Sequence, residues 1–310
     1  MPDITSLALV ILIAGAVALA VHRRSRQRLY RRLASQREAL IEGRAPHLAT
    51  RSDPGALRRE LRRSRIVRVE GFLAPADLAA LRAECETNRH RAKRSYIPKH
   101  KKGGTLSYEA IHRHAPTCLA FYRSRALQEW LSAVIGEPLT PTADHDQSSC
   151  SVLYYDEAGD HIGWHYDYNF YSGRHFTVLL SLVNRSAAGG LSSGRLMQRR
   201  RAGGDIEWDT AENVLVLFEG ARVLHRASPI SAGDLRVMLS MTFCTDPRIN
   251  PVNEVARRIK DTAYYGARAL IDSRPLGSFH ASPLAPLSCA ARVLRTSQSS
   301  ARCHVPLAGS

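Results

Sequence analysis

The chain contains 310 residues, of which 44% are hydrophobic and 23% are charged, and its formal net charge is +16. These fractions are ordinary for a globular protein, and the length suits one sizeable domain with additional segments, so a wholly disordered chain is excluded. The cysteines show no C-x-x-C spacing, which argues against a zinc site or a disulfide framework and indicates free thiols in a reducing compartment. They are Cys85, Cys118, Cys150, Cys244, Cys289 and Cys303.

An uncharged apolar stretch occupies residues 4–21. Its length is close to the lower limit for a helix that crosses a bilayer, which needs roughly 17–25 residues. We therefore predict a single N-terminal transmembrane helix within residues 1–21. A cleaved signal peptide and an ordinary buried helix are the alternatives, and the signal peptide fits less well because no basic residue precedes the apolar stretch.

Residues 22–65 are strongly basic. They contain fourteen arginines and four acidic residues, so this segment supplies +10 of the total net charge. Because positive charge beside a membrane span stays in the cytoplasm, we predict a single-pass membrane protein whose large domain faces the cytoplasm. The arginines would also be attracted to anionic lipid heads. No nucleic-acid partner is expected, because the position of the arginines beside the predicted membrane span already accounts for their number. With sparse apolar residues and several prolines and glycines, the segment is predicted to be a linker.

A strand and two helices are predicted next. Residues 66–73 have the pattern of a strand, and residues 74–85 that of a helix with proline and an acid in its first turn. A second helix is predicted from about residue 116 to residue 135. Between the helices, residues 91–104 are basic and rich in turn residues, which indicates a solvated loop. The alternative is a flexible lid that attracts an anionic substrate or lipid surface.

The motif His165-Tyr166-Asp167 is the first part of a candidate metal site. Residues two apart on a strand point to the same side, so His165 and Asp167 can converge on one ion while Tyr166 faces the other way. His225 follows a short apolar run, residues 214–220, that predicts a strand and a turn. Two imidazoles and one carboxylate are the ligand set that holds ferrous iron on one face and leaves the other face open.

Arg236 lies within a run of strand character, residues 235–243. Alternation places it on one face with Met238, Ser240 and Thr242, while the other face is apolar. An arginine directed into a barrel requires an anion, because an unpaired buried charge is costly. A guanidinium fork suits a carboxylate bidentately.

Residues 66–246 resemble the Fe(II)/2-oxoglutarate-dependent dioxygenases, and within them the prolyl 4-hydroxylase-like branch. The resemblance depends on LYYDEAG at residues 153–159, GWHYD at 163–167, RHFTVLLSL at 174–182, Gly-Gly at 189–190 and HRASPI at 225–230. It implies a mainly β domain with flanking helices, spanning residues 66–271, whose core is a double-stranded β-helix of the jelly-roll type. The predicted transmembrane helix would precede this core.

The resemblance also implies roles for individual residues. His165, Asp167 and His225 would be the iron ligands at the catalytic centre. Arg236 and Tyr155 would bind 2-oxoglutarate, and Thr177 is a further candidate contact for it. Arginine stands where collagen hydroxylases have lysine. The implied cofactors are Fe(II), 2-oxoglutarate and O2, with ascorbate as an additional candidate.

Asp167 bears on the reaction type, because family members that transfer halide lack this carboxylate. Its presence favours hydroxylation, or a related desaturation or demethylation. The expected substrate is a lipid, a small molecule or a protein, possessing a C–H bond near the membrane surface. Residues 184–204 are a candidate loop for substrate contact. The rival interpretations are a catalytically inactive jelly-roll binding module and a membrane-tethered interaction protein. Arg236 and Tyr155 argue against the first, because a bare metal site needs neither.

The C-terminal part contains one predicted helix, residues 251–270, with Val255, Ile259 and Ala263 on one side. Residues 272–310 are rich in Ser, Ala and Pro without sustained periodicity, which predicts a disordered tail.

Overall fold

The computed structural model describes residues 46–143, 146–200 and 203–265, together with 13–18, 20, 21, 24, 25, 28 and 31. Much of the predicted anchor, most of the predicted linker up to residue 45 and the whole predicted tail lie outside these residues. None of the helices in the described part of the chain has the length and apolar character needed to cross a membrane.

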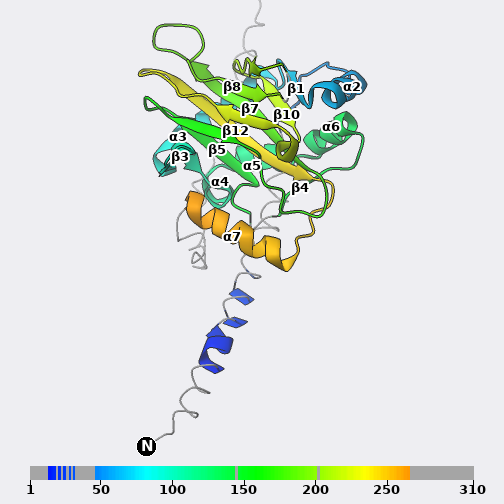
Figure 1. Cartoon of the computed structure of the whole chain (residues 1–310), viewed down its shortest axis with the longest axis vertical. Coiled ribbons are helices and arrows are strands. Elements are labelled where there is room, and N and C mark those ends of the chain that lie inside the picture. The colour runs from blue at the N-terminus through cyan, green and yellow to red at the C-terminus, as the bar shows by residue number, and fades with distance from the viewer. Residues whose placement is uncertain are drawn as a thin grey trace, which may run out of the picture. The chain divides into compact units, whose positions relative to one another are not determined.

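The core is a twelve-stranded antiparallel sheet in the order β1-β10-β7-β12-β5-β3-β6-β11-β8-β9, with β2 paired to β3 and β4 paired to β12 (Figure 1). The strands are β1 (Ile66–Val69), β2 (Lys93–Ile97), β3 (Lys101–Leu106), β4 (Thr140–Pro141), β5 (Cys150–Tyr155), β6 (His161–His165), β7 (His175–Arg185), β8 (Leu196–Arg199), β9 (Asp205–Trp208), β10 (Leu215–Phe218), β11 (Leu224–Ala227) and β12 (Leu235–Cys244). The sheet curls, so that strands from both halves of the order line one cavity, as the predicted jelly roll requires.

The two faces of the sheet have different environments. On β12, Val237, Leu239 and Met241 belong to the core that packs against the helices. Arg236 and Met238, with Ser240 and Thr242, line the cavity on the other face. This confirms the predicted alternation, and it places the one charged residue of the strand inside the barrel.

Helices cover the outer face of the sheet and one end of the barrel. They are α2 (Pro54–Ser64), α3 (Pro75–Asn88), α4 (Tyr108–His114), α5 (Pro116–Arg123), α6 (Arg125–Ile135) and α7 (Pro251–Tyr265), with 3-10 turns η1 (Arg89–Arg91) and η2 (Gly220–Arg222). The single helix predicted over residues 116–135 is divided at Ser124. The backbone of Ser124 is extended and its side chain accepts a hydrogen bond from the Leu127 amide, so it caps α6 instead of continuing α5.

Part of the predicted linker packs on the domain. Asp53 caps α2 by accepting hydrogen bonds from two backbone amides, and Pro54 occupies the first turn, where its missing N–H costs nothing. Leu57 and Leu61, four residues apart, lie in the main core. The proline and glycine that predicted an interrupted spacer therefore mark the beginning of a helix.

The basic segment over residues 91–104 is a hairpin of β2 and β3, so the predicted solvated loop is wrong here. β3 pairs with β5 and with β6, and its long-range pairing could not be seen in a local charge pattern. Lys101, at the start of β3, is only 4% exposed.

Helix α7 lies across one end of the sheet (Figure 1). Residues 266–270 of the helix predicted over residues 251–270 lie outside the described residues. The apolar and polar sides of α7 are reversed relative to an ordinary surface helix. Val252, Val255 and Ile259 are 77%, 57% and 66% exposed, whereas Arg257 and Asp261 are buried. The side that carries Val255 and Ile259 therefore faces outward.

Candidate metal centre and cosubstrate pocket

His165, Asp167 and His225 come together as one cluster. His165 ends β6 and is the direct partner of His225 on β11, and Asp167 follows two residues beyond the end of β6. Asp167 Oδ1 lies 3.4 Å from His165 Nε2 and 3.8 Å from His225 Nε2. All three ligand atoms lie within 4.8 Å of one another. Bonds of about 2.1 Å to one octahedral ion would separate neighbouring donors by about 3 Å, so this set fits a single divalent ion.

Backbone carbonyls orient both imidazole rings. The Nδ1 atom of His165 lies 2.8 Å from the carbonyl oxygen of Gly163, and that of His225 lies 2.9 Å from the carbonyl oxygen of Val223. When Nδ1 carries the proton and donates it to the carbonyl, Nε2 keeps its lone pair for a metal. Both Nε2 atoms are directed at Asp167.

Asp167 is held from two sides. The Thr177 hydroxyl donates a hydrogen bond of 2.5 Å to Asp167 Oδ2, and the Asp167 amide donates to the Gly220 carbonyl oxygen at 3.1 Å. A Cβ atom added to Gly220 would lie 2.2 Å from Asp167 Oδ2, so the backbone of η2 approaches the carboxylate more closely than any side chain allows. Thr177 also lines the cavity, and its predicted contact with 2-oxoglutarate stays a prediction.

The electrostatics of the cluster favour the metal-binding forms of Asp167 and His225, whereas the raised pKa of His165 favours a proton that a metal must displace. Burial alone would raise the pKa of Asp167, but His225 and His165 hold that pKa well below its usual range. Burial lowers the pKa of His225, which keeps its ring neutral. The pKa of His165 is raised, since its contact with Asp167 outweighs the effect of burial. A carboxylate and neutral rings are the ligand forms that a cation requires.

Arg236 lies in the same cavity, which has a volume of roughly 260 Å³. Its side chain is 2% exposed, its Nε has no hydrogen-bond partner, and its Nη2 makes one long contact of 3.4 Å with Thr210 Oγ1. No carboxylate of the described residues pairs with it. The guanidinium lies 5.3 Å from the centre of the Tyr155 ring, and burial raises the pKa of Tyr155 to about 12, which keeps its hydroxyl protonated. An unpaired guanidinium beside a hydroxyl donor suits a carboxylate ligand.

Comparison with known proteins agrees with this geometry. A family model described as HalD, Halogenase D, matches residues 49–173, which include β5, β6, His165 and Asp167. No curated protein matches the chain in sequence.

Solved structures match about two thirds of the chain. AviO1 from Streptomyces viridochromogenes Tue57 is 16% identical with a TM-score of 0.52, over 66% of this chain and 99% of that one. The non-heme alpha ketoglutarate dependent carbocyclase SnoK from nogalamycin biosynthesis is 13% identical with a TM-score of 0.51, over 69% and 93% of the two chains. The epimerase SnoN, in complex with Fe3+, alpha ketoglutarate and nogalamycin RO, is 16% identical with a TM-score of 0.50, over 62% and 84%. The chain has the Fe(II)/2-oxoglutarate oxygenase fold. The cluster of His165, Asp167 and His225 and the Arg236 side chain lie in one cavity of this fold. The solved examples of the fold include the SnoN complex with Fe3+ and alpha ketoglutarate, which is 2-oxoglutarate.

Aromatic residues surround the mouth of this oxygenase-fold cavity. Tyr166 and Tyr168 line it while remaining more than half exposed, and Phe170 lines it as a buried residue. The prediction that Tyr166 faces the other way is wrong, because β6 ends at His165 and strand alternation does not continue beyond it. Trp164 instead contacts the guanidinium groups of Arg199 and Arg226, which lie 4.1 and 4.7 Å from the centre of its ring. Of the predicted substrate loop at residues 184–204, Leu196 lines the cavity; residues 201 and 202 lie outside the described residues.

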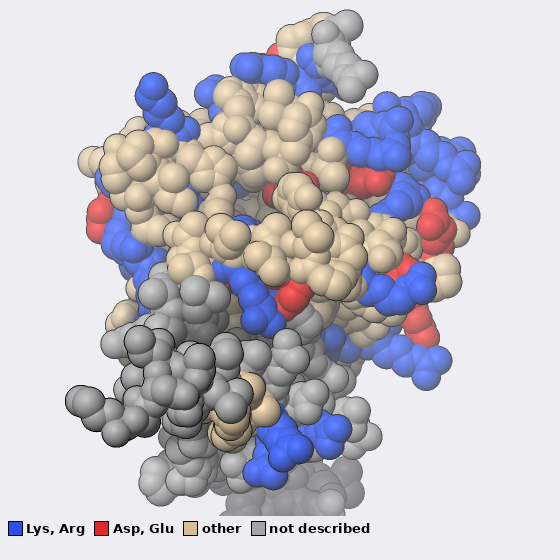
Figure 2. Space-filling model, turned by 60° about the horizontal axis from the view of Figure 1, so that its bottom comes forward, with Lys and Arg blue, Asp and Glu red and all other residues tan. Residues whose placement is uncertain are grey.

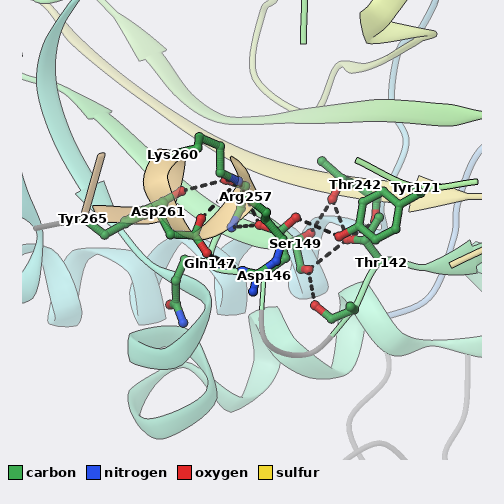
Figure 3. A network of polar contacts seen from close by, with 12 residues as sticks. Thr142, Asp146, Gln147, Ser149, Tyr171, Thr242, Arg257, Lys260, Asp261 and Tyr265 are labelled. Atoms are coloured by element: carbon green, nitrogen blue, oxygen red, sulfur yellow. Dashed lines mark hydrogen bonds and ion pairs between the residues drawn. The ribbon is translucent and has the colours of Figure 1, made fainter. Parts of the chain in front are cut away.

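The polar side of α7 takes part in a network of polar contacts around Asp146 (Figure 3). Lys260 Nζ donates to Asp146 Oδ1 at 2.9 Å and lies 3.1 Å from Asp261 Oδ1, while Arg257 Nη1 lies 2.6 Å from Asp261 Oδ2. Tyr171 donates to the other oxygen of Asp146 at 2.7 Å. Lys260 lines the cavity, but its charge is fully paired, so it is a structural contact and not a free binding group.

Sequence reasoning missed several of these residues. Gly220 was recognised only as part of a turn, and the contribution of α7 depends on its unusual orientation. No local pattern in the sequence marks Lys101, because its burial depends on the pairing of β3 with β5 and β6.

Proposed function

We propose that the protein is an Fe(II)/2-oxoglutarate-dependent oxygenase that hydroxylates a C–H bond of its substrate. The observation that supports this most directly is the presence, in one cavity, of a three-donor metal cluster and a buried guanidinium without a carboxylate partner among the described residues. A structural metal site would not need the guanidinium, and a buried unpaired charge is costly unless a ligand compensates it.

Each residue has a defined task in this proposal. His165, Asp167 and His225 would hold Fe(II), and Arg236 would bind the distal carboxylate of 2-oxoglutarate, with Tyr155 as a second donor. Bound iron and 2-oxoglutarate supply the oxidation, in which O2 is consumed, 2-oxoglutarate becomes succinate and CO2, and an oxygen atom enters a substrate C–H bond. The apolar side chains Leu153, Leu179 and Met238 line the cavity and exclude water from it.

Asp167 supports hydroxylation over halide transfer, although the matching family model is named for a halogenase. The carboxylate is fixed by Thr177 and by the Gly220 backbone, and it occupies the coordination position that a halide would need. Product mass decides between the two: in the presence of chloride, hydroxylation adds about sixteen daltons and chlorination about thirty-four.

The test is iron- and oxygen-dependent formation of succinate from 2-oxoglutarate by the purified protein. His165→Ala should abolish it, and His161→Ala is the matched control, because His161 lies on the same strand, bonds the Gly159 carbonyl oxygen and is outside the metal cluster. If the wild type neither turns over nor binds 2-oxoglutarate in calorimetry, the rival interpretation of a nonenzymatic binding module is correct.

We further propose that the enzyme acts at the cytoplasmic surface of a membrane, on a lipid or a membrane-associated substrate. Three features support this: the apolar residues 4–21, the fourteen arginines that follow, and the outward apolar stripe of Val252, Val255 and Ile259 on α7 beside the cavity. Many Lys and Arg side chains lie on the face that comes forward when the α7 end is turned toward the viewer (Figure 2). A bilayer interface suits such a stripe because apolar side chains enter the lipid while basic ones contact anionic heads.

Membrane association has its own test. The full chain should resist extraction by alkaline carbonate, and a variant lacking residues 1–45 should still sediment with vesicles that contain anionic lipid. Val255→Ser with Ile259→Ser should weaken that sedimentation, while Thr262→Ser on the same helix should not. Release of the wild type by carbonate would contradict the N-terminal membrane span. Failure of the truncated protein to sediment with the vesicles would contradict membrane binding by the α7 surface.

A further inference from the structure

Lys101 places a second cation inside the cavity. It begins β3 and pairs with Ile162 on β6, and both side chains line the cavity. Thr105, on the same face of β3, pairs with Leu153, another lining residue. The inward direction of Lys101 is therefore fixed by strand register, and a buried lysine on an inward face requires an explanation.

Within the described part of the chain, the ammonium of Lys101 has one hydrogen-bond partner, the Thr105 hydroxyl at 2.7 Å, and it lies 5.2 Å from the centre of the Tyr264 ring on α7. No carboxylate of the described residues pairs with it. The other titratable side chains that it faces are His100 and His165, whose rings are 5.7 Å apart. Burial lowers the pKa of Lys101 to about 8, so that it stays largely protonated at neutral pH.

Neighbouring lysines show how unusual this is. Lys260 is paired with Asp146 and Asp261. Lys102, the next residue along β3, is 35% exposed, donates to the Ala158 carbonyl oxygen and lies 4.0 Å from Asp160. Lys101 is thus more deeply buried than Lys260 and lacks its anionic partners.

Charge balance indicates what is missing. Under the proposed function, Fe(II), the Asp167 carboxylate, the Arg236 guanidinium and doubly negative 2-oxoglutarate together carry no net charge. The charge of Lys101 remains uncompensated even when metal and cosubstrate are bound. Its surroundings also differ from those of Arg236: Lys101 lies with His100 and Tyr264 near α7, and Arg236 lies with Tyr155 and Thr210.

We propose that Lys101 binds an anionic group, a carboxylate or a phosphate, of the primary substrate. This inference rests on the proposed function and names a substrate class for the same cavity. The substrate group would contact the ammonium between β3 and α7, beside the metal cluster, while the Thr105 hydroxyl and the Tyr264 ring hold the lysine in place. A neutral or cationic substrate would leave the buried charge unpaired.

The experiment uses the full chain loaded with Mn(II) and N-oxalylglycine, an unreactive analogue of 2-oxoglutarate. Three probes of equal chain length, hexanoate, hexyl phosphate and hexanamide, are titrated and followed by ligand-observed NMR. Hydrogen bonds to charged groups predict that at least one anion binds roughly 10- to 100-fold more tightly than the amide. Comparison of the two anions distinguishes a carboxylate from a phosphate site.

Variants identify the residue responsible. Lys101→Met should remove the preference for the anion while leaving N-oxalylglycine affinity unchanged, and Lys102→Met is the matched control that should retain both. Lys101→Gln removes the charge but keeps a hydrogen-bond donor for Thr105. This variant replaces Lys101→Met in the titrations if the methionine variant does not fold.

Three results would overturn the inference. The wild type could prefer neither anion, or Lys101→Met and Lys101→Gln could keep the preference. Alternatively, the Lys101 variants could weaken the binding of N-oxalylglycine as strongly as Arg236→Met does, which would show that Lys101 binds the cosubstrate. Failure of the wild type to bind Mn(II) or N-oxalylglycine would instead refute the proposed function, and the inference with it.

Discussion

Gly220→Ala tests whether the backbone of η2 shapes the metal site. The added methyl carbon would lie 2.2 Å from Oδ2, 2.6 Å from Cβ and 2.8 Å from Cγ of Asp167, where ordinary contacts begin at 3.4 Å. The whole Asp167 side chain must therefore withdraw by about 1 Å, because no rotation of the carboxylate alone relieves all three contacts. Metal ligands tolerate displacements of about 0.2 Å.

We expect Gly220→Ala to weaken Mn(II) binding by roughly 10- to 100-fold, the usual effect of disturbing a group that supports a ligand. Isothermal titration calorimetry of the metal-free protein with Mn(II) measures the dissociation constant. Urea unfolding verifies that the variant folds, and overpacking should lower its free energy of unfolding by no more than about 3 kcal/mol. Gly55→Ala is the control, since a Cβ there meets only ordinary contacts with Asp53 and Arg59. An unchanged dissociation constant for Mn(II) would refute the argument.

Three further predictions concern single side chains of the cavity. Lys101→Met should be more stable than the wild type at pH 7, and this advantage should shrink by roughly 2 kcal/mol by pH 9.5. The folded-state pKa of Lys101 is lowered to about 8. Between pH 8 and 10.5 the unfolded wild type therefore binds more protons than the folded wild type, so the free energy of unfolding of the wild type rises with pH. An equal pH dependence of the free energies of unfolding of the two proteins, measured with urea, would contradict this. Arg236→Met should weaken N-oxalylglycine binding by at least 10-fold in calorimetry without changing Mn(II) affinity, and an equal loss of both would assign Arg236 a structural role. Thr177→Val removes the donor to Asp167 and should weaken Mn(II) binding by about 10-fold, whereas a loss confined to N-oxalylglycine would support the predicted 2-oxoglutarate contact instead.

The strands that carry His165, His225 and Arg236 could be predicted from the sequence because their determinants are local. Alternation over residues 235–243 identified the inward face of β12, and the single-residue spacing of His165 and Asp167 indicated a shared direction. The third ligand needed pairing across strands, and the structure supplies it by placing His225 directly opposite His165.

The remaining features depend on contacts between distant segments. A basic run such as residues 91–104 has the composition of a solvated loop, and only the pairing of β3 with β5 and β6 buries Lys101. Gly220 is unremarkable in sequence, because its importance arises from the position of Asp167, fifty-three residues earlier. The break between α5 and α6 was missed because Ser124 is compatible with a helix interior until its capping hydrogen bond is seen.

Because the polar side of α7 faces the barrel, release of this helix and unfolding of the sheet can be two separate events. Polar contacts hold the helix against the barrel, including those of Lys260 with Asp146 and Ser148 and the hydrogen bond that the Gln147 amide donates to Asp261. Release of the helix therefore exposes charged groups that water solvates readily and leaves the main apolar core intact. Access to the cavity can then change while the sheet remains folded. In hydrogen exchange, the amides of α7 should consequently open at a lower free energy than those of β7 and β12. The opening free energy of α7 would then be that of detaching this helix from the barrel while the sheet stays folded.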